Sequence, residues 1–593
     1  MTGISTDMVL HRKTPWPHPT AGLAVLLALL AAVPSPIFCQ QPSLTVEVRG
    51  VEQLPRDKIV DALRNHYRSD PRYLDTAAIQ SSLATIAATE GFFQSRIDSI
   101  HTRWKDSATT VTAFVHEGRR AVVRKFLIAN NKALSDSVLL DLADVVRDGM
   151  FSPAVLESDI ERIIKRYERE GYPFASVAVT GIRLNAARDS VDITLDVNEG
   201  SLFRVDEITV VGNTNTDRDV IIRESRIRKG EVYNPKKMLN IRRLLTRLRF
   251  FETVAEPQLY VKDGRNGILL SVTEGSTNTF DGILGYQPPR SSRETGYFTG
   301  LVNVAFRNLF GTGRSLSARW ERPSRSSQEI ELNYLEPWIF DLPLNIGGGF
   351  YQRQQDSTYI TQSFHAKVSY LVSDNVSVSA LLNSDAVIPS TEWKDNPLLS
   401  SSTLSGGLEL VIDTRDDVYN PHHGIMFINR YSGGNKYLAS DSGDVKSFIQ
   451  RITLDVGYYQ SLFGRFVGAI AFHGRQVRGS HLDVSDFFRL GGANTLRGYR
   501  EEQFLGSTAA WTSGELRYDL GRRSYIFGFI DYGYILQPAD AVLGTSETNL
   551  YLPGYGLGIH LETGLGVMGV SYALGKGDSL TDGKIHFGLI NEF

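Results

Sequence analysis

From residue 276 to residue 593 the chain consists largely of runs in which apolar and polar positions alternate. Within residues 448–460, for example, Ile452 and Leu454 alternate with polar neighbours, and residues 584–593 repeat the pattern. Successive side chains of a strand point to opposite faces, so one face of each run would meet lipid and the other a wet lumen. About sixteen runs recur at a spacing of about twenty residues, which suits membrane-spanning strands joined by turns. The pattern predicts a transmembrane β-barrel; a soluble β-sandwich is the alternative that would also explain alternation.

In two predicted strands near the end of the chain, the alternation of apolar and polar positions places two carboxylates on the face that points into the lumen. In residues 524–536, Ile526 and Ile530 share the apolar face, and Asp531 lies on the other. In residues 514–520, Glu515 alternates with outward apolar residues in the same way. Because a carboxylate facing lipid is costly, both acids are expected to point inward.

The N-terminal half has a different pattern, with three segments that each end in Val-x-Glu-Gly at Gly118, Gly200 and Gly275. A period of about 80 residues indicates repeated structural units. Each unit opens with a short strand, such as residues 46–48 or 208–213. Two helical stretches and two strands follow, which predicts the order β-α-α-β-β. Three generic α+β domains of some other type are the alternative.

The second unit illustrates this order. Helical spacing runs from Ser137 to Arg147, and Pro153 is suited to the start of the next helix. That helix is expected to end near Gly171, and residues 191–197 alternate as a half-buried strand. Its predicted apolar stripe consists of Val155, Ile160, Ile163, Ile164 and Tyr167.

The first 40 residues read as a cleaved secretory signal peptide. A basic segment, residues 11–13, precedes the apolar run 21–33, which is too short to span a membrane. Cys39 is the only cysteine, so no internal disulfide can form; lipidation of Cys39 and its removal with the signal both stay open. The net charge of −3 argues against nucleic-acid binding.

A glycine-rich loop lies between two predicted strands, with the sequence Arg-Leu-Gly-Gly-Ala-Asn-Thr-Leu-Arg-Gly-Tyr over residues 489–499. Together with Glu515 and Asp531, this loop resembles the inward-folded loop of the BamA/TamA superfamily of outer-membrane assembly proteins. The β-α-α-β-β units resemble POTRA domains, and their number is closest to the TamA-like branch. The fold class implied is α+β POTRA repeats followed by an all-β transmembrane barrel of about 16 antiparallel strands. The implied segments are a signal peptide (1–40), POTRA units (41–118, 119–200 and 201–275) and the barrel (276–593).

The resemblance assigns a role to the loop residues. Arg497 would reach into the lumen and pair with Asp531, with Glu515 as a second acceptor, because a guanidinium can bind a carboxylate through two hydrogen bonds. A solvated arginine in a surface loop is the alternative reading. The loop motif further includes Gly491, Gly492, Gly498 and Tyr499.

A lateral seam is expected where the first barrel strand, about residues 280–286, meets the last, about 585–593. The seam residues are Gly282, Gly285, Gly588 and Phe593. An open seam would expose unpaired backbone groups that can template an incoming strand. The resemblance thus implies insertion of β-barrel or autotransporter-like clients into a bacterial outer membrane, with the POTRA units in the periplasm binding clients by strand addition.

The implied partners are unfolded outer-membrane proteins, a TamB-like periplasm-spanning protein or accessory assembly proteins, and outer-membrane lipid, but no nucleic acid. No enzyme motif is found, and neither a cofactor nor a metal is expected. His422 and His423 beside Asp416 and Asp417 are read as a polar turn rather than a metal site. A two-partner secretion transporter is the alternative function. The POTRA units count against a passive porin, and the absence of a Gly-x-Ser-x-Gly element counts against a barrel fused to a patatin-like enzyme.

Overall fold

The computed structural model describes residues 43–69, 75–105, 108–147, 149–287, 297–390, 398–418, 420–440, 443–521, 523–539, 546–563 and 566–590. The expected signal peptide, Cys39 and Phe593 lie outside these ranges. The chain divides into two compact units, one holding the first two repeats and the other the third repeat and the barrel. No helix within the described ranges is long and apolar enough to cross a membrane.

The first repeat follows the predicted order. Its elements are β1 (Ser43–Arg49), α1 (Arg56–Ser69), α2 (Thr76–Thr89), β2 (Arg96–Lys105) and β3 (Ala108–His116). The last strand is central, since the sheet order is β1-β3-β2, with β1 parallel and β2 antiparallel to β3. Leu63 of α1 and Leu83 of α2 are buried in one core with Ala113 of β3.

The second repeat has the same sheet, in the order β4-β6-β5, but three helices. Its elements are β4 (Val122–Ala129), α3 (Asp136–Asp141), α4 (Asp144–Arg147), α5 (Pro153–Arg169), β5 (Ser176–Leu184) and β6 (Ser190–Asn198). The single helix predicted over 137–147 is therefore wrong: the chain breaks at Leu142, and two short helices replace it.

The buried stripe of α5 also differs from the prediction. Leu156 and Asp159 are buried beside Ile163 and Tyr167, whereas the predicted Val155, Ile160 and Ile164 are only half-buried. Asp159 lies inside because its carboxylate accepts hydrogen bonds from the first backbone amides of α4. Burial raises the pKa of this carboxyl despite those bonds. A polar residue satisfied in this way escapes a pattern based on hydrophobicity.

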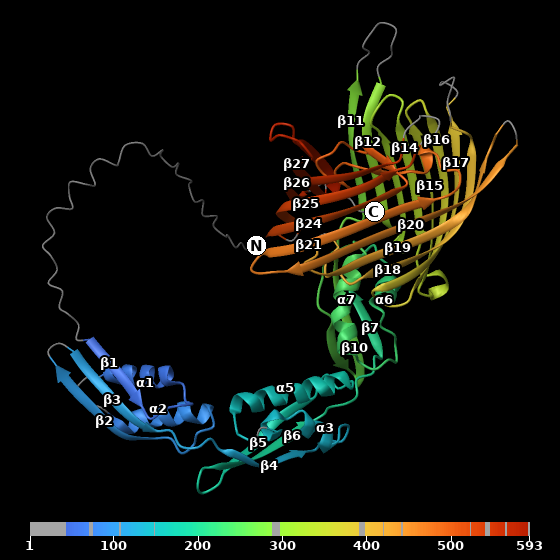
Figure 1. Cartoon of the computed structure of the whole chain (residues 1–593). Helices are drawn as coiled ribbons and strands as arrows, with labels where there is room; N and C mark the ends of the chain where they lie inside the picture. The colour runs from blue at the N-terminus through green and yellow to red at the C-terminus, as the bar shows by residue number, and fades with distance from the viewer. Residues whose placement is uncertain are drawn as a thin grey trace, which may run out of the picture. The chain divides into compact units, whose positions relative to one another are not determined.

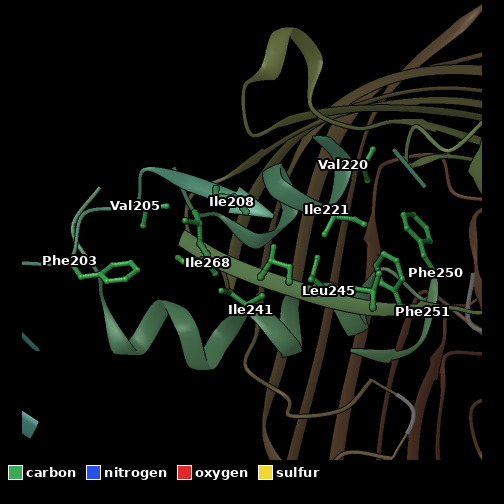
Figure 2. Packing of buried hydrophobic residues seen from close by; sticks show 13 residues of the cluster. Phe203, Val205, Ile208, Val220, Ile221, Ile241, Leu245, Phe250, Phe251 and Ile268 are labelled. Carbon is green, nitrogen blue, oxygen red and sulfur yellow. The ribbon is translucent and has the colours of Figure 1, made fainter. Parts of the chain in front are cut away.

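The third repeat comprises β7 (Glu207–Val211), α6 (Arg218–Ser225), α7 (Pro235–Arg247), β8 (Phe251–Val254), β9 (Gln258–Lys262) and β10 (Arg265–Glu274). Three strands rather than two follow the helices, because β8 and β9 pair with opposite ends of β10. Figure 2 shows Ile241 and Leu245 of α7 beside Ile268 of β10 in its core. Asn234 caps α7 and Pro235 begins it, as the start of a helix favours.

The repeated glutamate has one structural role in all three units. Glu117 accepts hydrogen bonds from backbone amides of residues 52–54, Glu199 from those of residues 132–133, and Glu274 from those of residues 215–216. Each carboxylate therefore ties the end of the last strand to the loop after the first. Burial alone would raise the pKa of Glu274, but these bonds and one from the Thr214 hydroxyl lower it to about 2.

Within the described residues, sixteen of the remaining strands form one antiparallel sheet that curls into a barrel (Figure 1), as predicted. The first eight are β11 (Asn278–Gln287), β12 (Tyr297–Leu309), β13 (Arg314–Arg322), β14 (Gln328–Glu336), β15 (Leu344–Gln355), β16 (Tyr359–Leu371), β17 (Val376–Pro389) and β18 (Ser401–Asp413). The second eight are β19 (His423–Leu438), β20 (Val445–Ser461), β21 (Phe466–Arg478), β24 (Thr508–Gly521), β25 (Ser524–Gln537), β26 (Thr548–Thr563), β27 (Gly566–Leu574) and β28 (Lys584–Ile590).

Strands β11 and β28 are the two ends of this sheet, and over the described part of the chain no hydrogen-bonded ladder joins them. Gly282 and Gly285 lie in β11, opposite Val302 and Thr299 of β12. Gly588 lies in β28, opposite Gly569 of β27. These glycines therefore sit on the two strands that border the seam.

Candidate functional site in the barrel lumen

The candidate site is built on residues 479–507, the long connection between β21 and β24. This segment contains a 3-10 turn, η2 (Val484–Asp486), and a small hairpin formed by β22 (Phe488–Leu490) and β23 (Phe504–Gly506). We call it the lumen loop. Leu490 and Leu496 are fully buried in a cluster with Ile535 of β25, so the loop packs against the inner wall.

Glycines shape the tip of the lumen loop. Gly491, Gly492 and Gly498 have φ values of +119°, +108° and +91°, which side chains rarely allow. At Gly498 the space is closed as well, because a Cβ would lie 2.6 Å from the backbone carbonyl of Leu574. Only glycine lets the tip approach β27 this closely.

Arg497, at that tip, is held on several sides. Its Nε and Nη2 donate to the two carboxylate oxygens of Asp531 at 2.8 and 2.7 Å, and its backbone amide donates to the same group at 3.1 Å. Nη1 donates to Glu515 at 2.7 Å, and Nη2 also donates to Ser513 at 2.6 Å. The guanidinium carbon lies 3.6 Å from the ring centroid of Phe529.

This arrangement satisfies a charge that would otherwise be costly to bury. Asp531 is fully buried in β25, and Arg497 is 9% exposed. Removing one partner of such a pair leaves the other uncompensated in a site of low dielectric constant. Glu515 also accepts hydrogen bonds from Arg517, on the same strand, so the network extends along β24.

The tip also contacts the strands at the seam end of the sheet. The Gly498 amide donates to Nε2 of His586 in β28 at 3.1 Å. The Tyr499 hydroxyl donates to the carbonyl of Pro553 in β26 at 2.8 Å and accepts from the Lys576 amide at 3.1 Å. The lumen loop therefore touches the last strand itself.

A second set of ion pairs holds the base of the loop to the opposite part of the sheet. The carboxylate of Glu502 accepts two hydrogen bonds from the guanidinium of Arg353 in β15, one of them at 2.7 Å. The same carboxylate lies 3.2 Å from the guanidinium of Arg489. Arg489 donates in turn to the hydroxyl of Tyr359, the first residue of β16.

Near the start of the loop, the fully buried Lys436 of β19 lies 2.7 Å from Asp483 and 2.5 Å from Asp486. The loop is thus attached on both sides of the lumen.

The structure brings together Arg497, Asp531 and Glu515, and it places Gly498 against β28 and Tyr499 against β26. The contacts of Ser513 and His586 with the loop tip, and the anchors at Glu502 and Lys436, were not predicted from the sequence. Strand parity does place His586 on the polar face, between the exposed Ile585 and Phe587, but it does not identify Gly498 as its partner. Nothing in the local sequence identifies the partner of Glu502.

The turn with two histidines connects β18 and β19. His422 Nε2 lies 2.5 Å from Asp519 of β24, and the amides of His422 and His423 donate to Asp416. Within the described ranges, no cluster of three or more potential metal-ligating side chains occurs.

Comparison with known proteins identifies two recurring modules. Residues 308–593 match the Omp85 superfamily domain, and residues 121–200 and 203–275 match the POTRA model, described as a surface antigen variable number repeat. The outer membrane protein assembly factor BamA of Neorickettsia risticii is 24% identical over 445 residues, which are 70% of this chain and 56% of that protein. BamA of Neisseria meningitidis is 26% identical over 275 residues, 45% of this chain and 33% of that protein.

Among solved structures, BamA from Haemophilus ducreyi lacking POTRA domains 1–3 shows 17% identity and a TM-score of 0.48, covering 79% of this chain and 98% of that one. The chain spans between a third and three fifths of the length of the BamA proteins of Neorickettsia risticii, Neisseria meningitidis and Nitratidesulfovibrio vulgaris.

Proposed function

This chain belongs to the Omp85 superfamily, and from that premise we propose that it is an outer-membrane assembly factor that helps to insert β-barrel proteins, or autotransporter-like clients, through a lateral seam. We place the POTRA units at residues 41–118, 119–200 and 201–275, in the periplasm, and the barrel at 276–593. The protein would work through backbone pairing and membrane exit, without a catalytic residue or a cofactor.

The observation that carries this proposal is the seam. Fifteen strand pairs make the sheet continuous from β11 to β28, while no ladder joins these two over the described residues. Each of the two strands therefore has one edge whose amide and carbonyl groups can pair with an incoming strand. A client strand paired there would have its apolar side chains facing lipid already, and it could leave sideways without crossing a hydrophobic barrier.

The lumen loop supports the proposal as a latch. Arg497 ties the loop to β24 and β25, and its neighbour Gly498 is hydrogen-bonded to His586 on β28. We propose that this attachment holds the last strand in place when the seam is at rest. Movement of the tip would then alter the edge that β28 offers.

The POTRA units would deliver clients or hold a partner. Each sheet is small, and β2 and β5 each pair with a neighbour on one side in the sheet orders β1-β3-β2 and β4-β6-β5. Such edges can accept an extended peptide as an additional strand. From the number of repeats we propose a TamB-like periplasm-spanning partner; accessory assembly proteins are the other partner class.

Depletion of the protein followed by quantitative proteomics of outer-membrane and culture-supernatant fractions tests this function. If the protein is an assembly factor, its depletion should lower the amounts of many integral barrel proteins in the membrane fraction. Selective loss of one or a few secreted proteins, with barrel proteins unchanged, would instead support the two-partner secretion transporter.

Complementation tests the latch. We expect Arg497→Glu to fail to restore barrel assembly and a second change, Asp531→Arg, to restore part of it, because the two charges exchange places. Full activity of Arg497→Ala would contradict the latch but not the assembly function.

A further inference from the structure

A cavity of about 720 Å³ lies between the third repeat and the rim of the barrel, within one compact unit of the chain. On the repeat side it is lined by the end of α6, the following residues 226–231 and the start of α7. On the barrel side it is lined by the β14–β15 and β16–β17 turns. Its volume is within the range of small-molecule sites, about 300–1,000 Å³.

The third repeat lines its side of the cavity with three arginines, Arg223, Arg226 and Arg228. The Arg226 guanidinium stacks over the ring of Trp338, with its central carbon 4.6 Å from the ring centroid. Arg223 uses one nitrogen to donate to the Thr312 carbonyl at 2.7 Å. The Nε atoms of Arg223 and Arg226 are buried without a hydrogen-bond partner among the described residues. Arg228 is exposed, so it offers a further cation to a ligand.

The barrel turns contribute carboxylates on the other side. Asp341 and Asp374 both line the cavity, and Asp374 accepts a long hydrogen bond of 3.5 Å from the Asn240 side chain. The third lining carboxylate, Glu231, is paired with Lys237 at 2.6 Å. Asp341 has a φ of +58°, an uncommon conformation for a residue with a side chain. Its turn is anchored to the repeat by the hydrogen bond from the Trp338 indole to Glu224 at 2.8 Å. The cavity thus presents separated charges of both signs.

The apolar part of the lining lies at the outer rim of the barrel. Tyr370 and Val372 line the cavity and are 52% and 56% exposed. Tyr370 shares its parity on β16 with the exposed Phe364 and Val368, so it belongs to the outward face of the sheet. Tyrosine is enriched where such a face meets the lipid head groups.

We propose that this cavity binds the head group of a phospholipid that carries both a phosphate and a primary ammonium group. The phosphate would meet Arg226 and Arg228, because guanidinium groups bind phosphate oxygens through directed hydrogen bonds. The ammonium would donate to Asp341 and Asp374, and the acyl chains would leave along Tyr370. The inference rests on the proposed membrane location of the barrel, and it assigns the lipid to the leaflet that faces the POTRA units.

Native mass spectrometry of the purified full-length mature protein tests the proposal, with dimyristoyl phosphatidylethanolamine, phosphatidylglycerol and phosphatidylcholine added in turn. We expect retention of phosphatidylethanolamine above the other two, because only its head group pairs a phosphate with N–H donors. Arg228→Gln should weaken this binding about tenfold, the effect of losing one charge-assisted contact. Asp341→Asn should reduce the preference for phosphatidylethanolamine over phosphatidylglycerol, and asparagine tolerates the left-handed backbone.

Arg242→Gln is the matched control, since Arg242 lies on α7 but is paired with Glu256 at 3.0 Å rather than lining the cavity. Heat-dependent migration on gels verifies that each barrel is folded. Equal retention of the three lipids, or equal loss in the control and in Arg228→Gln, would overturn the proposal. Full competition by water-soluble glycerophosphoethanolamine would also overturn it, by showing a site for a free phosphodiester. The readout is lipid binding, so its failure is distinct from a failure of client assembly.

Discussion

Replacement of Asp531 by alanine should release the tip of the lumen loop. Asp531 is fully buried and accepts three hydrogen bonds from Arg497, two of them from the guanidinium. The variant leaves Arg497 buried with Glu515 and Ser513 as its remaining partners.

Breaking a buried ion pair costs about 3–5 kcal/mol, and the remaining carboxylate of Glu515 places this case near about 3 kcal/mol. Since about 1.4 kcal/mol corresponds to a factor of ten, the released state should be populated about a hundredfold more often.

Limited trypsin digestion measures this population. Arg489, Arg497 and Arg500 lie in the loop, and the chain must leave the inner wall before the protease can bind it. When opening and closing are fast relative to cleavage, the cleavage rate follows the open population. We therefore expect the fragment that begins within the loop to form about a hundredfold faster in Asp531→Ala than in the parent protein.

The control is Asp519→Ala, which removes an inward acid from the adjacent strand. Asp519 contacts Asn420 and His422 in the β18–β19 turn, not the tip of the loop. Its cleavage rate within the loop should match that of the parent. A rate for Asp531→Ala within about threefold of the parent, with the barrel still folded, would refute the argument that this ion pair holds the loop.

Three further predictions concern other parts of the chain. Gly498→Ala adds a side chain at a φ of +91° and should accelerate loop cleavage about ten- to hundredfold; an unchanged rate would contradict the steric argument. Glu502→Gln removes the charge opposite Arg353 and should expose the loop base, seen as faster hydrogen exchange there but not at the tip. The pKa of Glu274 is about 2 in the folded protein against an ordinary 4.5, so its stabilising contribution is complete above about pH 4.5 and disappears as the pH falls towards 2. Exchange protection of the Thr216 amide, corrected for intrinsic rates, should fall over that interval, and Glu274→Gln should remove the pH dependence.

Much of the fold follows from local pattern. A period of two specifies which residues of a strand share a face, so the inward direction of Asp531 and Glu515 could be predicted from their neighbours. Repetition of the Val-x-Glu-Gly ending indicated three similar units. The structural role of the glutamate, however, depends on a loop about 60 residues earlier in each unit, which no local window contains.

The predictions about the helices of the second repeat were wrong for a related reason. Asp159 reads as a surface residue in any hydrophobicity pattern, and the break at Leu142 lies within a continuous apolar stripe. Both depend on how α4 and α5 meet, because the buried carboxylate is stabilised only by amides that α4 presents to it.

The amino-acid sequence by itself determined the barrel, the repeats and the faces of the strands, because these depend on spacings within a few residues. Tertiary structure alone decided which inward groups meet. Arg497 binds Asp531 across 34 residues, Gly498 reaches His586 across 88, and Glu502 finds Arg353 across 149. Such partners are set by the register of the whole sheet and by the path of one loop through its lumen, since a charged side chain in a confined space pairs with whichever opposite charge the closed barrel places within reach.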